Sequence, residues 1–133
     1  AAVLLAKFPY LAAWGARRRE LAALYSAAFA GVAGVTPPPV DPANEHIFHQ
    51  YTIRAERREA LLAHLKSRGI GHKVYYPLAL HLQPCFEYLG VRAGALPITD
   101  RATAEVVSLP IYPELTSAQT DAVIAAVREF YQG

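Results

Sequence analysis

Four prolines within residues 36–42 make this the stretch that most restricts how the chain can fold. Proline lacks the amide donor and restricts the residue before it, so this stretch ends any helix that reaches it. Upstream, apolar residues recur at mostly helical spacing from Pro9 to Ala28. The sequence therefore predicts a long amphipathic helix that ends at Gly31 and Gly34, followed by an extended connector.

Strand and helix signals follow the connector. Residues 46–54 alternate between two sets of side chains, which is typical of a strand. Leucines at helical spacing then predict a helix from Glu56 to Arg68, with Gly69 just past its end. Residues 72–76 are rich in aromatic and β-branched side chains, and we expect a second strand there.

The last third of the chain indicates two helices and one strand. Pro97 can open a helix that runs through Glu105, and residues 106–109 predict a third strand. Residues 116–119 have the pattern of a capping box, and the apolar stripe that follows predicts a helix to the end of the chain. The order of elements indicates the α+β class: a small three-stranded sheet flanked by helices, with a long N-terminal helix.

The composition is that of one ordinary globular domain, with 133 residues of which 53% are hydrophobic and 18% charged. A formal net charge of +2 is too small to indicate nucleic acid or a membrane as a partner. The single cysteine, Cys85, excludes an internal disulfide and fits a reducing compartment, so we expect the cytoplasm. Because the chain contains no methionine, we expect a processed product or a piece of a longer protein.

Histidines are the first candidates for chemistry, because neither a glycine-rich phosphate loop nor a known catalytic motif occurs. His46 and His49 would lie on opposite faces of the expected strand, so we predict no metal site. His49 would share its face with Ile47 and Tyr51. This arrangement favours a core histidine over a substrate-facing one.

A loop bounded by prolines, residues 77–84, holds the strongest candidate for a binding role. His81 lies there among mostly apolar residues, where a polar ring has no local packing reason to be. Loops held by a rigid scaffold are where binding groups concentrate. Tyr75 and Tyr76 precede the loop. We expect at least one of them in the core, while the other offers its hydroxyl group at a cleft.

Four segments occur in an order that resembles a known family. They are residues 46–54, the helix end at 68–70, residues 75–84, and residues 108–116 followed by Gln119. Together they resemble the carboxyl-terminal portion of the sugar aminotransferases that depend on pyridoxal phosphate (PLP), the DegT/DnrJ/EryC1/StrS family. The resemblance implies that residues 1–30 form a helix linking from a PLP-binding large domain. It also implies that residues 31–133 form the C-terminal small domain.

The resemblance further implies the activity of the parent protein. Members of the family are homodimers with active sites at the subunit interface, and they commonly move an amino group from L-glutamate to a nucleotide-linked keto sugar. Their cofactor lysine, pyridine-pairing aspartate and main phosphate-binding groups belong to the large domain. The lysines of this chain, Lys7, Lys66 and Lys73, lie in a different sequence setting. We therefore expect no catalytic residue in this chain and no activity from it alone.

The resemblance also suggests which residues contact substrate. The loop with His81 is expected to approach the bound sugar or its nucleotide, and Tyr75 or Tyr76 is expected to line the same cleft. His49 is a further candidate for contact with substrate. Ala79 stands where many relatives have proline, which makes the loop less rigid in this chain.

Two alternatives stay open at this point. Some members of the same family have histidine in place of the cofactor lysine and act as sugar dehydratases, and the position that decides this lies upstream of residue 1. The second alternative is a stand-alone, non-catalytic α+β binding module whose ligand site is the His81 loop.

Overall fold

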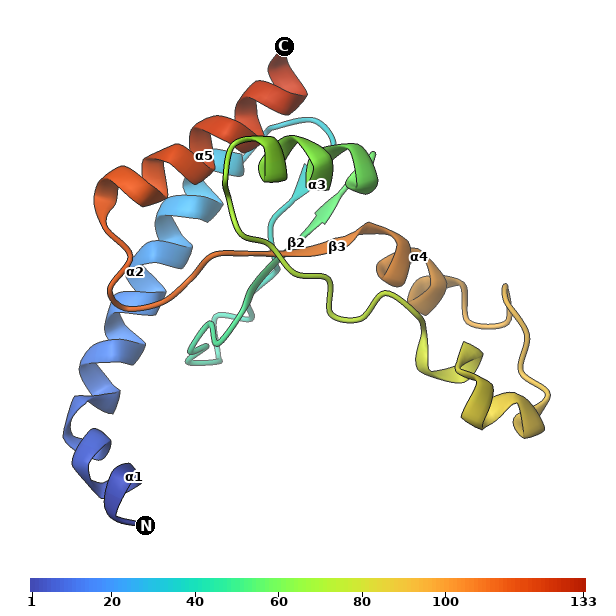
Figure 1. Ribbon diagram of the computed structural model, residues 1–133, viewed down its shortest axis with the longest axis horizontal. Helices are drawn as coiled ribbons and strands as arrows, with labels where there is room; N and C mark the ends of the chain where they lie inside the picture. The colour runs from blue at the N-terminus through green and yellow to red at the C-terminus, as the bar shows by residue number, and fades with distance from the viewer.

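The computed structural model describes residues 1–133 and has a three-stranded antiparallel sheet at its centre (Figure 1). The strands, in spatial order, are β1 (Val35–Thr36), β2 (Tyr51–Ala55) and β3 (Val106–Leu109). Val35 pairs with Ala55, and Tyr51 pairs with Leu109, so β2 is bonded along both of its edges. The α+β class and the three-stranded sheet expected from the sequence are confirmed.

The helices are α1 (Ala2–Lys7), α2 (Leu11–Phe29), α3 (Arg58–Ser67), α4 (Pro97–Glu105) and α5 (Ser117–Gln132). Of these, α2, α3 and α5 share the hydrophobic core with the sheet. Helix α5 packs against both α2 and α3 (Figure 1). Tyr51 and Ile53 of β2 are fully buried in the same core cluster as Leu61 of α3 and Val127 of α5. Burying each side chain of this size stabilises the fold by about 1.5–3 kcal/mol.

The last helix starts where its sequence predicts. The Thr116 hydroxyl accepts a hydrogen bond from the Gln119 amide at 3.2 Å, and the Gln119 side chain accepts one from the Thr116 amide at 3.0 Å. These two bonds satisfy amides that have no partner within the helix. The capping box is confirmed, and so are the predicted helix at Pro97–Glu105 and the predicted strand at residues 106–109.

Two segments extend away from the compact part of the molecule on opposite sides (Figure 1). One comprises α1, the 3-10 turn η1 (Phe8–Tyr10) and the start of α2, and every side chain of residues 1–13 is exposed. The other is the side arm, residues 76–105, which holds the 3-10 turns η2 (Leu80–Leu82) and η3 (Pro84–Leu89) and returns through α4. None of the helices is both long enough and apolar enough to cross a membrane.

One expected strand is shorter than predicted. Residues 46–50 are not in the sheet, because Phe48 adopts a left-handed conformation with φ 46° and its amide donates to Nδ1 of His46 at 3.0 Å. The strand therefore begins only at Tyr51. The argument that placed His46 and His49 on opposite strand faces was wrong, because neither residue lies in a strand.

A second strand was misplaced along the sequence. Residues 72–76 do not form a strand, and only Lys73 pairs with β3, through Ser108. The third strand of the sheet is β1, which comes from the start of the proline-rich connector. It is two residues long. Pro37 follows it directly, and proline has no amide to donate to a neighbouring strand.

Candidate functional site

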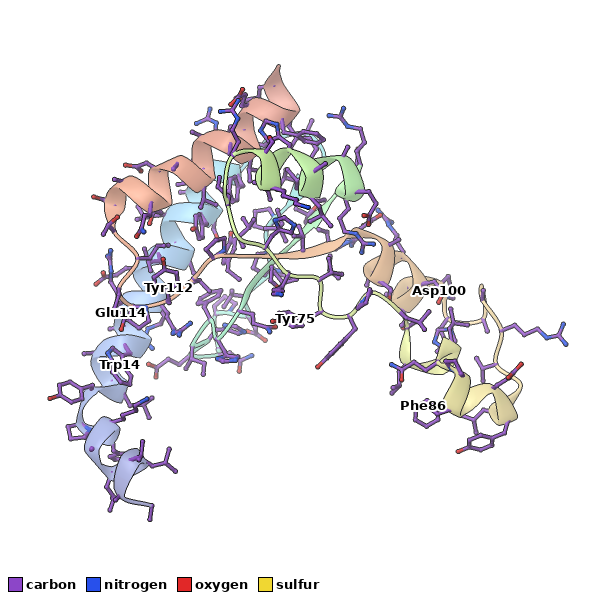
Figure 2. All side chains as sticks on the ribbon, in the orientation of Figure 1. Trp14, Tyr75, Phe86, Asp100, Tyr112 and Glu114 are labelled. Carbon is purple, nitrogen blue, oxygen red and sulfur yellow. The ribbon has the colours of Figure 1, made fainter.

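One pocket brings together two of the four residues that the sequence singled out. It lies beside β3 and has a volume of about 550 Å³. We call it the β3 pocket and define it by the residues that line it: His49, Gln50, Gly71, His72, Lys73, Tyr75, Ser108, Leu109, Pro110 and Ile111. Figure 2 places Tyr75 near the middle of the molecule, between the N-terminal helix and the side arm.

Pairing to β3 holds one wall of the β3 pocket. The Lys73 amide donates to the Ser108 carbonyl at 3.1 Å, and the Ser108 amide donates to the Lys73 carbonyl at 2.7 Å. The Ser108 hydroxyl in turn bonds the Thr52 hydroxyl of β2 at 2.8 Å. The His72 ring is oriented by a 3.1 Å contact between Nδ1 and the Ile70 carbonyl. The segment before the side arm is therefore fixed to the sheet.

Arg18 of α2 holds the opposite wall. Its Nη1 donates to the carbonyl of Ile111 at 2.9 Å and to that of His49 at 3.3 Å. It also lies 3.5 Å from the carbonyl of Phe48. One guanidinium thus ties the loop before β2 to the loop after β3, because arginine presents several donors in a fixed plane.

The positions of His49 and of the two tyrosines differ from the sequence-based expectations. His49 is exposed, and its neighbour Phe48 is buried instead, because the left-handed turn at Phe48 reverses which side chain faces the core. The prediction of a core histidine was wrong. Tyr75 is 42% exposed and Tyr76 is 73% exposed. Neither tyrosine is in the core, so that expectation was also wrong.

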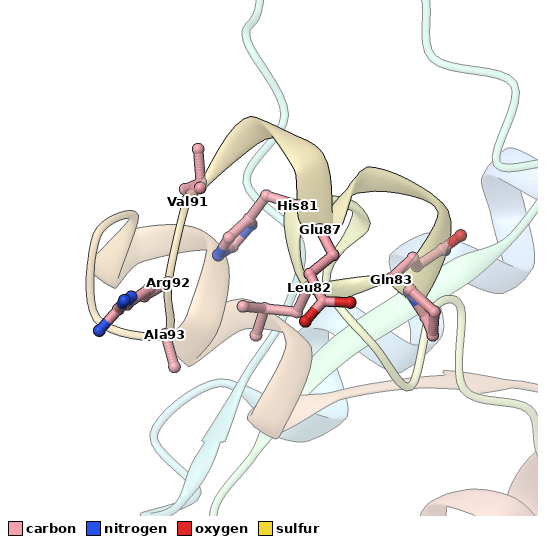
Figure 3. A pocket seen from close by; sticks show the side chains of 9 residues that line it. His81, Leu82, Gln83, Glu87, Val91, Arg92 and Ala93 are labelled. Carbon is pink, nitrogen blue, oxygen red and sulfur yellow. The ribbon is translucent and has the colours of Figure 1, made fainter.

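His81 lies in a different pocket, within the side arm (Figure 3). This arm pocket has a volume of about 590 Å³ and is also lined by Glu87 and Arg92. The His81 side chain is only 9% exposed, and its Nε2 lies 3.2 Å from Oδ1 of Asp100 in α4. Both atoms are buried, and neither has a hydrogen-bond partner, so the two side chains lie in contact without a hydrogen bond between them.

Asp100 also holds the loop that closes the arm pocket. Its Oδ2 accepts a hydrogen bond from the Gly94 amide at 2.7 Å. The carboxylate thus contacts both the loop before α4 and His81 of η2. Sequence reasoning missed Asp100, because its only local signal is an acidic residue in the first turn of a helix, which is ordinary at that position.

The structure therefore separates the four candidates. His49 and Tyr75 share the β3 pocket, and His81 lies in the arm pocket. Tyr76 lines neither of these pockets and is exposed on the surface. Sequence reasoning also missed Gln50, His72 and Lys73, which line the β3 pocket. The sequence around a polar residue at the end of a short strand does not indicate whether the residue will line a pocket or lie on the open surface.

The lysines of the chain test whether it could hold PLP. The cofactor needs a lysine in a closed site and a carboxylate against its pyridine nitrogen. Lys7, Lys66 and Lys73 are all exposed. Lys73 lines a pocket, but none of the residues around it is acidic. These residues do not fit the cofactor. No group of three potential ligands is placed to hold a metal ion.

Comparison with known proteins gives a consistent result. The model of the DegT/DnrJ/EryC1/StrS aminotransferase family matches residues 1–128. The chain is 47% identical to a pleiotropic regulatory protein of Geobacillus stearothermophilus, covering 99% of the chain and 36% of that relative. It is 39% identical to dTDP-3-amino-3,4,6-trideoxy-alpha-D-glucose transaminase of Streptomyces venezuelae, covering 98% of the chain and 34% of that relative.

Solved structures agree with the sequence matches. DesV of S. venezuelae superposes with a TM-score of 0.96 at 38% identity, over 99% of this chain and 36% of DesV. A DegT DnrJ EryC1 StrS aminotransferase from Brucella abortus superposes with a TM-score of 0.91 at 33% identity, over 99% of this chain and 35% of that protein. The chain spans about a third of the length of the relatives it matches. With a family model that matches nearly its whole length, the chain belongs to the DegT/DnrJ/EryC1/StrS aminotransferase family.

Proposed function

We propose that this chain is the C-terminal small domain of a PLP-dependent enzyme that moves an amino group from L-glutamate to a nucleotide-linked keto sugar. The observation that carries the proposal is the match to a dTDP-sugar transaminase over 98% of the chain, together with the superposition on DesV. Identity of 38–39% supports a shared reaction class more than a shared sugar.

The proposal assigns residues 1–30 to a helix that links to a PLP-binding large domain and residues 31–133 to the small domain. Exposed apolar side chains support this division. Val3, Leu4, Leu5 and Phe8 are between 69% and 73% exposed. Apolar side chains gathered in this way mark a surface that another part of a protein covers.

Pyridoxal phosphate, when bound, carries the amino group between donor and acceptor. We place its lysine and phosphate-binding groups outside these residues, because the exposed lysines here do not fit it. The work left to this chain is to bind and orient the sugar substrate. Orientation alone can supply a large share of a rate enhancement.

We assign the substrate contacts to His49 and Tyr75 in the β3 pocket, to His81 in the arm pocket and to Tyr76 between them. Tyr75 and Tyr76 present accessible hydroxyl groups and ring faces, which suit the polar edges and apolar faces of a sugar ring. His81 lines the arm pocket beside Asp100. It acts in this proposal as a binding group and not as a proton carrier.

We further propose a homodimer in the cytoplasm. The exposed apolar residues of the side arm, among them Tyr88 and Ile98, support contact with another protein surface. The single cysteine, which is free and exposed, supports a reducing compartment. Size-exclusion chromatography with light scattering of the full-length gene product measures the oligomeric state directly.

The activity is tested with the full-length gene product, PLP and L-glutamate. We expect sustained formation of 2-oxoglutarate only when a dTDP- or UDP-linked keto sugar is also present. Steady formation of 2-oxoglutarate without the sugar, or none with it, would contradict the proposal.

A further inference from the structure

Two loops that border the β3 pocket have almost no backbone hydrogen bonds of their own. We call residues 45–50 the His49 loop and residues 110–115 the Ile111 loop. The His49 loop makes no hydrogen bond to any other backbone group. The Ile111 loop contains one, from the Leu115 amide to the Tyr112 carbonyl. Loops of this kind open easily unless side chains hold them.

Three side chains of α2 hold the Ile111 loop. They donate to three of its backbone carbonyls, at distances of 2.9, 2.9 and 3.2 Å. The donors are Tyr25 to Pro110, Arg18 to Ile111 and Arg17 to Leu115. The path of this loop is therefore set by α2, the helix that the proposed function assigns to the link with the rest of the parent protein.

The backbone of the His49 loop has one anchor on another element, which is Arg18. Its Nη1 lies 3.3 Å from the His49 carbonyl and 3.5 Å from the Phe48 carbonyl. The bond from the Phe48 amide to His46 stays within the loop. Phe48 has a positive φ of 46°, which a bulky side chain adopts only where the surroundings hold it. Arg18 supplies part of that hold.

The charge of Arg18 is directed at carbonyl groups. Arg18 takes part in none of the ion pairs of the molecule. A guanidinium has five donors in one plane, so it can bond carbonyls of two loops at once, and a charged donor makes stronger bonds than a neutral one. A lysine at the same position would offer one compact ammonium group in place of this plane.

The two loops form parts of the wall of the same pocket. His49 and Gln50 line the β3 pocket from the His49 loop, and Pro110 and Ile111 line it from the Ile111 loop. Arg18 bonds both loops without lining the pocket itself. The spacing between these parts of the wall therefore depends on a side chain that lies outside the pocket.

We propose that Arg18 is a positioning residue for amino transfer. By holding the His49 loop against the Ile111 loop, it keeps the β3 pocket in the shape that the sugar substrate enters. Its use in the reaction rests on the proposed function, whereas the holding of the two loops does not. A pocket that is already shaped loses less conformational entropy on binding, so the effect falls on the KM of the sugar more than on kcat.

The experiment compares three variants of the full-length gene product. Arg18→Met removes the donors and keeps the apolar stem, and Arg18→Lys keeps a charge. Arg17→Met is the matched control, because Arg17 is the neighbouring arginine and bonds the Ile111 loop but not the His49 loop. Initial rates of 2-oxoglutarate formation with PLP, L-glutamate and a dTDP- or UDP-linked keto sugar give kcat and KM. Hydrogen exchange without substrate follows residues 45–50.

We expect Arg18→Met to raise the KM of the keto sugar about tenfold, because misplaced binding groups are costly. Its kcat should stay within about threefold of the parent value. Arg18→Lys should recover part of the loss, and Arg17→Met should leave the KM unchanged. Exchange in residues 45–50 should be faster in Arg18→Met alone. A merely structural loss would lower the amount of folded enzyme, and with it the apparent kcat, without moving the KM.

Three kinetic outcomes would overturn the proposal. They are an unchanged KM in Arg18→Met, a fall in kcat at constant KM, and equal rises in KM in Arg17→Met and Arg18→Met. If the parent transfers no amino group, the proposed function fails, and the exchange measurement then decides the structural part. Faster exchange confined to Arg18→Met would support the hold on the His49 loop, and exchange equal to that of the parent would refute it.

Discussion

Lys73 and Ser108 face each other across two backbone hydrogen bonds, of 3.1 and 2.7 Å, and this is the last pairing that the chain makes before it leaves the sheet for the side arm. Both residues of this pair line the β3 pocket, so the point where the chain leaves the sheet forms one of the walls of the pocket. The predictions below concern the contacts that hold this region together.

Replacing Arg18 should loosen both loops that it joins. Arg18→Met keeps the apolar part of the side chain but leaves the carbonyls of His49 and Ile111 without their donor. We expect a loss of about 2 kcal/mol in the free energy of unfolding, as for hydrogen bonds to a charged group. Urea denaturation measures the loss of free energy, and hydrogen exchange in residues 46–50 and 110–115 measures the loosening of the two loops.

Arg19→Met is the control for Arg18. Arg19 pairs with Glu45, whose side chain is 77% exposed, and exposed pairs are worth little. We expect a change below about 0.5 kcal/mol. Equal losses in the two variants would show that Arg18 does not join the loops as described.

Gly34 and Gly31 should respond differently to alanine. Both have positive φ, of 84° and 75°, so either substitution strains the backbone by about 1–2 kcal/mol. At Gly34 a Cβ would also lie 2.7 Å from the Tyr131 ring, whereas at Gly31 nothing lies within 4 Å. We expect Gly34→Ala to cost about 1–3 kcal/mol more than Gly31→Ala in urea denaturation. A cost at Gly31 equal to that at Gly34 would contradict the described contact with Tyr131.

The capping box should contribute measurably to α5. Thr116→Ala removes the hydroxyl that accepts from the Gln119 amide. We expect a loss of about 1 kcal/mol in the free energy of unfolding, since the amide loses its partner. Ser117→Ala, one residue further on, should cost less than about 0.5 kcal/mol, as most surface substitutions do. Hydrogen exchange of the first turn of α5 distinguishes the two variants.

Acid should weaken the anchor between the side arm and the sheet. The hydrogen bonds from Arg54, and next from Arg101, lower the pKa of Glu105 below its ordinary value of 4.5. Because the folded form binds the proton less readily than the unfolded form, the stabilisation is complete above the ordinary pKa. It is lost as the pH falls through the lowered one.

Glu105→Gln tests this pH dependence. The variant should be less stable than the parent at neutral pH and should lose the part of the acid dependence that belongs to Glu105. Urea denaturation at a series of pH values measures both effects. If the parent and Glu105→Gln weaken in parallel as the pH falls, then Glu105 does not anchor the arm through its charge. The effect is modest, because Glu105 lies near the surface.

Helix starts that depend on a local sequence signal were predicted correctly. Pro97 opens α4 and the Thr116 capping box opens α5, because a proline or a cap acts on its own few neighbours. Residues 46–50 were predicted to be part of a strand but lie outside the sheet, and β1 was not predicted. Neither segment has a local sequence signal that indicates its structure. At the turn, Phe48 packs in the core and Arg18 of α2 bonds its carbonyl and that of His49, while β1 exists only through its pairing with β2, so both features involve residues distant in the sequence.

The candidate site was predictable only in part. The resemblance pointed to His81 and to Tyr75 or Tyr76, and His49 was a further candidate. The structure divides these four residues between two pockets and the surface. Lys73 gave no signal, because its place in a pocket depends on pairing with Ser108 across the sheet. Alternation of side chains cannot indicate which distant strand a residue will join.

The most direct test of the account follows the amino nitrogen. The full-length gene product is incubated with PLP, ¹⁵N-labelled L-glutamate and a dTDP- or UDP-linked keto sugar, and the nucleotide sugar is recovered for mass spectrometry. The account predicts a nucleotide-linked amino sugar that carries the ¹⁵N label. A nucleotide sugar that has lost water and carries no label would make the enzyme a dehydratase, and an unchanged sugar would contradict the proposed activity altogether.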